Sequence, residues 1–251
     1  MKQGAKHPTL MAFGLLIIWF LCTNIATLMP QEKNADTIDW FYPEWAASAP
    51  YNTPIVVRDT ESALGRYTLK TKRISLRDLV LFHGHLCDGL VIAFVEIKAV
   101  LEKLFPDGVV DRTDLRAVSK NGPCWVDAVS MMTGARINFQ TLRIDATVDD
   151  GFIIQRISTG EAYEVHLKPG VFPEMQASLE ARIRQRRAEG KVVSAAEIDQ
   201  YEAMANELSR KMLTTPAEQL LTITPKPDYK FRFNDLYGSR GDIINKEMPR
   251  Y

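Results

Sequence analysis

Cysteine and histidine are scarce in this chain of 251 residues, which has three cysteines and four histidines. Three cysteines are too few for a scaffold held together by disulfides. An excess of either charge is also absent, because 31 basic and 31 acidic side chains balance each other. Without a basic excess the chain lacks the electrostatic footprint of a nucleic-acid-binding protein, so no nucleic-acid partner is expected.

Polar residues are almost missing from one stretch, Leu10 to Met29, near the N-terminus. About 20 apolar residues is the length of a helix that crosses a bilayer. This length predicts a membrane anchor through residues 10–29. Because lysines precede the run and acidic residues follow it, we expect the rest of the chain to lie outside the cytoplasm. The alternative is a cleaved signal peptide, which would leave the protein periplasmic or secreted. No good small-x-small cleavage site supports that alternative.

Composition divides the chain into four segments. Residues 1–30 are the cytoplasmic tip and the membrane segment or signal peptide, and residues 31–65 form an extracytoplasmic spacer rich in proline and aromatic residues. Residues 66–173 carry short, closely spaced helix and strand patterns, which predict a folded core. Residues 174–251 contain a helical extension and a polar tail.

The core segment predicts an α+β fold, in which an antiparallel sheet is surrounded by helices. Helix patterns with a helix-starting residue before them occur at 76–82, 89–104 and 124–133. Strand patterns occur at 66–71, 115–119, 141–148, 151–158 and 162–167. Short turns separate the last three strands, and this spacing favours antiparallel hairpins over crossover connections.

The extension predicts two long charged helices, at 174–189 and 194–212, and a short strand at 229–233. A mixed charge run of this kind is usually a solvated surface, so the helices are expected to form a solvated antiparallel pair or a dimer arm.

The stretch FHGHLCDG, residues 82–89, places two histidines and a cysteine within five positions. Imidazole and thiolate are common ligands for zinc-type metals. In an extended loop, residues two apart point the same way, so His83, His85 and Cys87 can converge on one point. The neighbouring glycines allow the backbone to wrap round it.

A second cysteine, Cys124, begins the predicted helix at 124–133, and Cys87 lies where the helix at 89–104 begins. The positive end of a helix stabilises a thiolate. Asp127 follows Cys124 by one turn and can act as ligand, orienting partner or proton acceptor. Two histidines and two cysteines suffice as the ligand set for zinc, and three of them would leave an open position for catalysis. A Cys87–Cys124 disulfide, or neither role, remains open from the residues alone.

The segments FHGHLCDGL and CWVDAVSMMTGA together resemble the FmdE family, named for one component of formylmethanofuran dehydrogenase. That family carries an H-G-H-x-C-P-G-L stretch and a C-x-x-D-A helix ending in T-G, and the resemblance covers residues 73–170. It implies an α+β core, an intertwined homodimer and a cleft with a divalent metal, with zinc as the expected ion. The family's ligands correspond to His83, His85, Cys87 and Cys124, and its helix aspartate corresponds to Asp127.

The sequence departs from the family at two points. Asp88 replaces the proline that follows the first cysteine, which adds a carboxylate beside the site. Since no cysteine follows Cys124, the C-terminal zinc finger of some relatives cannot form here. The exposed-strand pattern around His166 does not predict a ligand.

Two functions follow as hypotheses. The first is a membrane-tethered zinc-type metalloenzyme acting on a small molecule, with Cys87 and Asp127 as catalytic residues. Arg136 and Arg143 are then the candidates for binding an anionic substrate. The second is a non-catalytic metal-binding carrier, sensor or accessory component of a redox enzyme.

Overall fold

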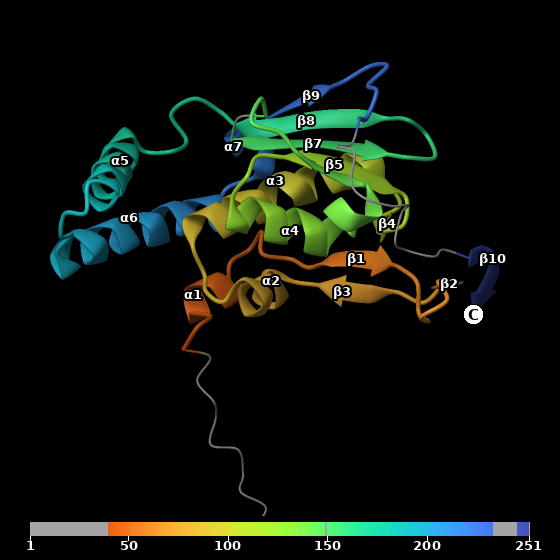
Figure 1. The fold of residues 1–251 in the computed structure, drawn as a ribbon. Helices are drawn as coiled ribbons and strands as arrows, with labels where there is room; N and C mark the ends of the chain where they lie inside the picture. The colour runs from red at the N-terminus through yellow and green to blue at the C-terminus, as the bar shows by residue number, and fades with distance from the viewer. Residues whose placement is uncertain (1–39, 149, 233–244, 251) are drawn as a thin grey trace, which may run out of the picture. The chain divides into compact units, whose positions relative to one another are not determined.

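The structure, a computed structural model, describes residues 40–148, 150–232 and 245–250 (Figure 1). The apolar run from Leu10 to Met29 lies outside these described residues. Among the helices that the structure does describe, none combines the length and the apolar character needed to span a bilayer. Membrane anchoring therefore stays a prediction.

A five-stranded sheet in the order β6-β5-β7-β8-β9 forms one layer of the molecule. Its strands are β5 (Leu115–Ser119), β6 (Leu142–Ile144), β7 (Gly151–Arg156), β8 (Ala162–Leu167) and β9 (Leu221–Pro225). The β7–β8 hairpin is antiparallel as predicted, and the β5–β7 and β8–β9 pairs are antiparallel too.

The expectation of a purely antiparallel sheet is wrong, because β6 pairs with β5 in parallel. Between these strands the chain forms helix α4 (Pro123–Thr133) and a 3-10 turn, η1 (Ile137–Phe139). A helix between two strands is the crossover that parallel pairing requires, so β6 returns beside β5 instead of forming a hairpin with β7.

Two smaller sheets are also mixed or parallel. Strand β1 (Ile55–Arg58) pairs antiparallel with β3 (Lys72–Ile74) and parallel with β4 (Val109–Asp111). Strand β2 (Arg66–Thr68) pairs in parallel with β10 (Asn245–Arg250). The predicted spacer thus contributes a strand to the fold, because β1 lies within residues 31–65.

Helix α3 (Asp88–Leu104) lies at the centre of the unit formed by residues 41–251 and contacts β7, β8, α4 and α6 (Figure 1). Its Leu90, Phe94, Ile97 and Leu101 are almost fully buried. Burying each such side chain stabilises the fold by roughly 1.5–3 kcal/mol before the cost of ordering the chain. The central position of α3 fixes both of its ends within the fold.

The remaining helices follow the predicted patterns closely. Helix α2 (Leu76–His83) begins with a capping box in which Ser75 and Asp78 satisfy each other's backbone N–H groups. Helices α5 (Glu174–Ala188) and α6 (Ala195–Thr214) match the predicted charged pair, while α1 (Glu44–Ala47) and α7 (Ala217–Leu220) are single turns. The C-terminal part of α6 is not a solvated surface, because Leu208, Met212 and Leu213 belong to the main core.

The strand predicted at 229–233 is not formed by residues 229–232, the part of it that the structure describes. The sheet edge is occupied instead by β9, a strand that was not predicted although its LTIT residues alternate between apolar and polar. Pairing with β8 makes it a strand.

Candidate metal site

His83 is the last residue of α2, and the helix stops at Gly84, whose φ of 102° places it in the left-handed region that favours glycine. The chain then passes through His85 and reaches Cys87, the N-cap residue of α3. His83 therefore comes from a helix end, whereas the sequence predicted an extended loop for all three residues. The sharp stop at Gly84 still turns the chain back so that Cys87 lies beside His83.

The two ring nitrogens of His83 have different partners. Nδ1 lies 2.8 Å from an oxygen of Asp127, and the His83 side chain is only 4% exposed. Nε2 lies 3.6 Å from the sulfur of Cys124 and 3.9 Å from the sulfur of Cys87. Asp127 thus holds one side of the imidazole and directs the other toward the two sulfurs.

The two cysteine sulfurs lie 3.4 Å apart, and both residues are free cysteines. This separation is well beyond the S–S bond length of about 2.05 Å. His85, which is exposed, completes a group with His83 and Cys87, because the potential ligand atoms of these three residues are all within 4.8 Å of one another. The structure therefore brings His83, His85, Cys87, Cys124 and Asp127 together.

Helices α3 and α4 approach each other closely at their N-termini because residue 89 has no side chain. A Cβ atom at Gly89 would lie 3.1 Å from the sulfur of Cys124 and 3.1 Å from the nearest ring atom of Trp125. Such contacts are tighter than ordinary packing allows. A side chain at residue 89 would therefore require Cys124 and Trp125 to shift by a few tenths of an ångström.

The cysteine pair carries one favoured negative charge. The hydrogen bond from Cys87, the charge of His83 and its own backbone N–H lower the pKa of Cys124 to about 7. Sharing its proton with Cys124, together with burial, raises the pKa of Cys87. The contact between the two sulfurs therefore favours the thiolate form of Cys124 over that of Cys87.

Asp88, the residue that departs from the family motif, is buried beside Cys87. Its carboxylate accepts hydrogen bonds from the Gly89 N–H at 2.9 Å and from Gln176 Nε2 of α5 at 2.6 Å. Burial nevertheless raises the pKa of Asp88. Helix α5 is thus tied to the N-terminus of α3, a contact that the sequence pattern did not reveal.

The predicted substrate residues and His166 lie elsewhere. Arg136 follows the C-terminal end of α4, whereas Cys124 lies in the first turn of that helix. Arg143, in β6, pairs with Asp145 at 2.9 Å and donates to the backbone oxygen of Arg232 at 3.0 Å. His166 is exposed on β8, as its pattern predicted. Substrate binding by Arg136 and Arg143 stays a prediction.

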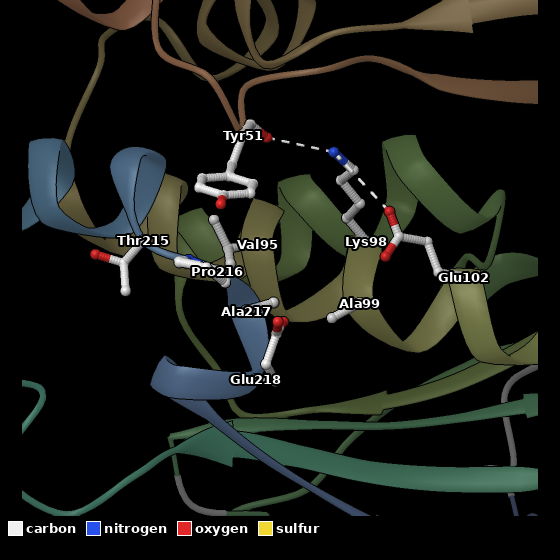
Figure 2. A pocket seen from close by; sticks show the side chains of 9 residues that line it. All are labelled: Tyr51, Val95, Lys98, Ala99, Glu102, Thr215, Pro216, Ala217 and Glu218. Atoms are coloured by element: carbon white, nitrogen blue, oxygen red, sulfur yellow. Dashed lines mark hydrogen bonds and ion pairs between the residues drawn. The ribbon is translucent and has the colours of Figure 1, made fainter.

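A cavity of about 240 Å³ opens on a different face of α3 (Figure 2). Figure 2 shows Tyr51 and Pro216 on its walls and Lys98 turned toward Tyr51 and Glu102. Lys98 donates to the backbone oxygen of Tyr51 at 3.3 Å, so it ties this segment to α3. None of the cysteine and histidine residues above lines this cavity.

An α+β domain that gathers histidine and cysteine at the ends of three helices has the features of a metal-binding protein. The family model described as FmdE, molybdenum formylmethanofuran dehydrogenase operon, matches residues 82–222, which is 141 of 251 residues. The chain belongs to the FmdE family. The match continues past residue 170, where the motif resemblance ended, through α5 and α6 to β9.

Among solved structures, the chain is similar to the crystal structure of an FmdE-like protein of the tungsten formylmethanofuran dehydrogenase type from Syntrophus aciditrophicus. The two proteins are 16% identical over 65% of this chain and 78% of the other, with a TM-score of 0.38. No curated protein matches this chain.

Proposed function

We propose that this FmdE protein binds a zinc-type divalent ion through His83, Cys87 and Cys124, with His85 as the fourth candidate ligand. The observation that carries the proposal is the separation of the three buried or half-buried donor atoms: 3.4 Å between the sulfurs, and 3.6 and 3.9 Å from each sulfur to His83 Nε2.

These separations lie within about 0.4 Å of the edges of a zinc tetrahedron. With Zn–S of about 2.3 Å and Zn–N of about 2.0 Å, two sulfurs lie about 3.8 Å apart and a sulfur and a nitrogen about 3.5 Å apart. The donor set, two thiols and an imidazole, is also the one that zinc prefers. A dithiol without metal would not need His83 Nε2 turned toward both sulfurs.

Asp127 supports the same proposal from outside the ligand set. A metal-binding histidine usually donates its other ring N–H to a carboxylate, which fixes the tautomer and strengthens the metal bond. The 2.8 Å contact between His83 Nδ1 and Asp127 is of this kind. Asp127 is 31% exposed, so it can also exchange a proton with solvent or with a bound molecule.

Within this proposal the protein is a metalloenzyme that acts on a small molecule. A bound zinc ion would supply Lewis acidity, Asp127 would hold or pass a proton, and the exposed side of the cluster at His85 would admit the substrate. The alternative is a non-catalytic metal carrier, sensor or accessory component of a redox enzyme. It is favoured by the nearness of a fourth donor, because ligation by both histidines would close the zinc site.

Elemental analysis and X-ray absorption of the purified protein test the proposal. We expect about one zinc per chain, with two sulfur ligands. Cys87→Ser and Cys124→Ser should lose most of the metal, because a serine hydroxyl stays protonated near neutral pH. His166→Ala and Cys22→Ser are the matched controls and should keep it. Metal-free protein with Cys87 joined to Cys124 would contradict the proposal. Two nitrogen ligands would favour the non-catalytic alternative, and one nitrogen with an oxygen ligand would favour the enzyme.

Attachment to a membrane through residues 10–29, on the extracytoplasmic side, and a homodimeric state complete the proposal. A chain starting at Gln31 should leave the membrane fraction and keep its metal, because all the proposed ligands lie after Gly65. If that shortened protein stays with membranes, another part of the chain binds lipid.

A further inference from the structure

A lysine that the sequence motifs did not single out lies beside the cysteine cluster. Lys120 directly follows β5, and two residues separate it from the start of α4. Its Nζ lies 3.7 Å from the centre of the Trp125 ring. The Trp125 ring and the Cys124 sulfur both approach within 3.2 Å of the same point above Gly89. The Trp125 ring thus borders the space at Gly89 that the Cys124 sulfur also borders, and Lys120 lies over that ring.

Lys120 is held by a weak and replaceable partner. It pairs with Asp150, whose side chain is 70% exposed, while the Lys120 side chain is 27% exposed. An ion pair with one solvated member contributes little to stability, about 0–1 kcal/mol. Releasing Lys120 to another anion therefore costs little, because water solvates Asp150 when the pair opens.

A second cation approaches the cluster from α5. Gln176 contacts Asp88, the neighbour of Cys87, and Glu180 and Arg184 follow it at intervals of four residues on the same side of the helix. Arg184 lies two turns beyond Gln176 on that side of α5, and its side chain is 77% exposed. Its partner is Glu180, at 2.5 Å. Arg184 is therefore also a cation that can turn toward a ligand at the cluster.

We propose that the cysteine–histidine site takes a small anionic molecule whose carboxylate or phosphate oxygens are bound by Lys120, with Arg184 as a second contact. This inference rests on the proposed metal site and specifies its substrate class. It places anion binding at the N-terminal end of α4, where the ligands are, and differs from the expectation for Arg136 and Arg143.

The charge pattern explains the separate roles of the two cations. Lys120 is a compact charge anchored over an aromatic ring, so it fixes one end of the anion. Arg184 has a planar group that can bind two oxygens, but its exposure leaves it mobile. Loss of Lys120 should therefore weaken binding more than loss of Arg184.

The test uses zinc-loaded full-length protein and measures the binding of acetate, inorganic phosphate and neutral acetamide by ligand-observed NMR. We expect acetate or phosphate to bind at least five-fold more tightly than acetamide. Lys120→Met keeps the aliphatic packing on Trp125 and should weaken anion binding at least five-fold, whereas Lys120→Arg should restore it. Arg184→Gln should weaken binding two- to three-fold. Comparison of acetate with phosphate identifies the oxyanion preferred.

Matched controls separate charge at this site from charge in general. Lys226 pairs with Glu164 at 2.9 Å and Arg186 pairs with Glu197 at 2.9 Å, so Lys226→Met and Arg186→Gln remove similar pairs elsewhere. Both should leave anion binding unchanged. Metal content is measured in every sample: if native protein holds no zinc, the proposed function fails. If zinc is present but Lys120→Met binds as native, or Arg136→Gln weakens binding more than Lys120→Met, the inference is overturned.

Discussion

The N–H groups at the C-terminal end of helix α4 are hydrogen-bonded to neighbouring residues, whereas in its first turn the Cys124 sulfur faces two further candidate metal ligands. At the C-terminal end, Gly134 N–H donates to Ser130 and Ala135 N–H donates to the Thr133 hydroxyl. At the N-terminal end, the Cys124 sulfur faces Cys87 and His83, and the buried indole N–H of Trp125 has no hydrogen-bond partner among the described residues.

The difference indicates which end is available for chemistry. A helix end whose groups are all bonded stabilises the fold and offers nothing to a ligand. An end with an unpartnered donor, a cysteine whose thiolate form is favoured and a neighbouring oriented imidazole is suited to bind one. One helix thus joins a structural end to a functional end, and substitutions at the two ends should have separable effects.

Gly134→Ala should have the largest effect on stability. Gly134 has a φ of 74°, and a Cβ there would lie 2.7 Å from the backbone oxygen of Arg112. The left-handed backbone costs about 1–2 kcal/mol for a residue with a side chain, and the close contact adds to it. We expect the free energy of unfolding to fall by roughly 2–3 kcal/mol, measured by denaturant titration.

Gly160→Ala is the matched control, because Gly160 has the same φ of 74° but nothing within 4 Å of the added Cβ. It should lose only the backbone part, about 1–2 kcal/mol. Zinc per folded molecule should stay the same in both variants. If Gly134→Ala loses metal while still folded, the two ends of α4 are not independent.

Asp127→Asn should have the next largest effect, a loss of metal affinity at the N-terminal end of α4. The amide keeps the shape of Asp127 but removes the charge that orients His83 at 2.8 Å. Loss of such an outer partner typically lowers metal affinity about 10–100-fold. Competition with a zinc chelator measures this change. Asp145→Asn, which removes a paired carboxylate away from the cluster, should leave the affinity unchanged; equal losses in both would remove Asp127 from the site.

Two buried carboxyl groups, Asp114 and Glu96, also differ in whether their oxygens are hydrogen-bonded. Asp114 accepts from Arg156 Nε at 3.0 Å and from the Ser158 N–H at 2.9 Å, so it is fully bonded. Glu96, on α3, is 0% exposed, and neither of its carboxyl oxygens has a hydrogen-bond partner among the described residues. Burial holds the pKa of Glu96 well above its usual value.

Glu96→Gln should therefore stabilise the protein increasingly as pH rises. Below the unfolded-state pKa of about 4.3, Glu96 is neutral in both states and the two proteins should differ little. Above it the unfolded chain ionises while the folded chain keeps its proton, so the native protein loses stability as pH rises toward the folded pKa. The slope approaches about 1.4 kcal/mol per pH unit. Denaturant titrations from about pH 5 to 8.5 measure this pH dependence of the free energy of unfolding, with the exposed Glu102→Gln variant as the control. If the free energy of unfolding depends on pH in the same way for native protein and Glu96→Gln, Glu96 ionises freely in the folded state.

Local signals in the sequence predicted much of this fold. The Ser75–Asp78 capping box, Pro123 before Cys124 and Gly134 after Thr133 each fix a helix end through contacts within a few residues. The approach of Cys87 to Cys124 was predictable in part because each was expected where a helix begins, whereas His83 was expected in an extended loop and lies at the end of α2. These features depend on short-range backbone bonding, which a sequence displays directly.

Features that depend on tertiary pairing were not predictable. Strand β6 pairs in parallel because α4 carries the chain back to the sheet, and β9 joins the opposite edge of that sheet beside β8. Lys120 stacks on Trp125, and Gln176 reaches Asp88 from 88 residues away in sequence. The only local indication of the contact between Lys120 and Trp125 was that Lys120 lies four residues before Cys124, the neighbour of Trp125.

Arg136→Gln should change stability and zinc content least among these variants. It tests whether the C-terminal end of α4 has only a structural role. The backbone of Arg136 is bonded through its N–H to the Thr141 hydroxyl at 3.1 Å and through its carbonyl to the Leu142 N–H, so these bonds survive loss of the side-chain charge. The guanidinium stacks on Phe139 at 5.3 Å, a contact worth about 0.5–1 kcal/mol when exposed, which Gln keeps in part. We expect the free energy of unfolding to change by less than about 0.5 kcal/mol and zinc content to stay at the native value. A loss of anion binding in this variant, with metal and fold intact, would instead assign substrate recognition to the C-terminal end of α4 and reverse the roles of the two ends.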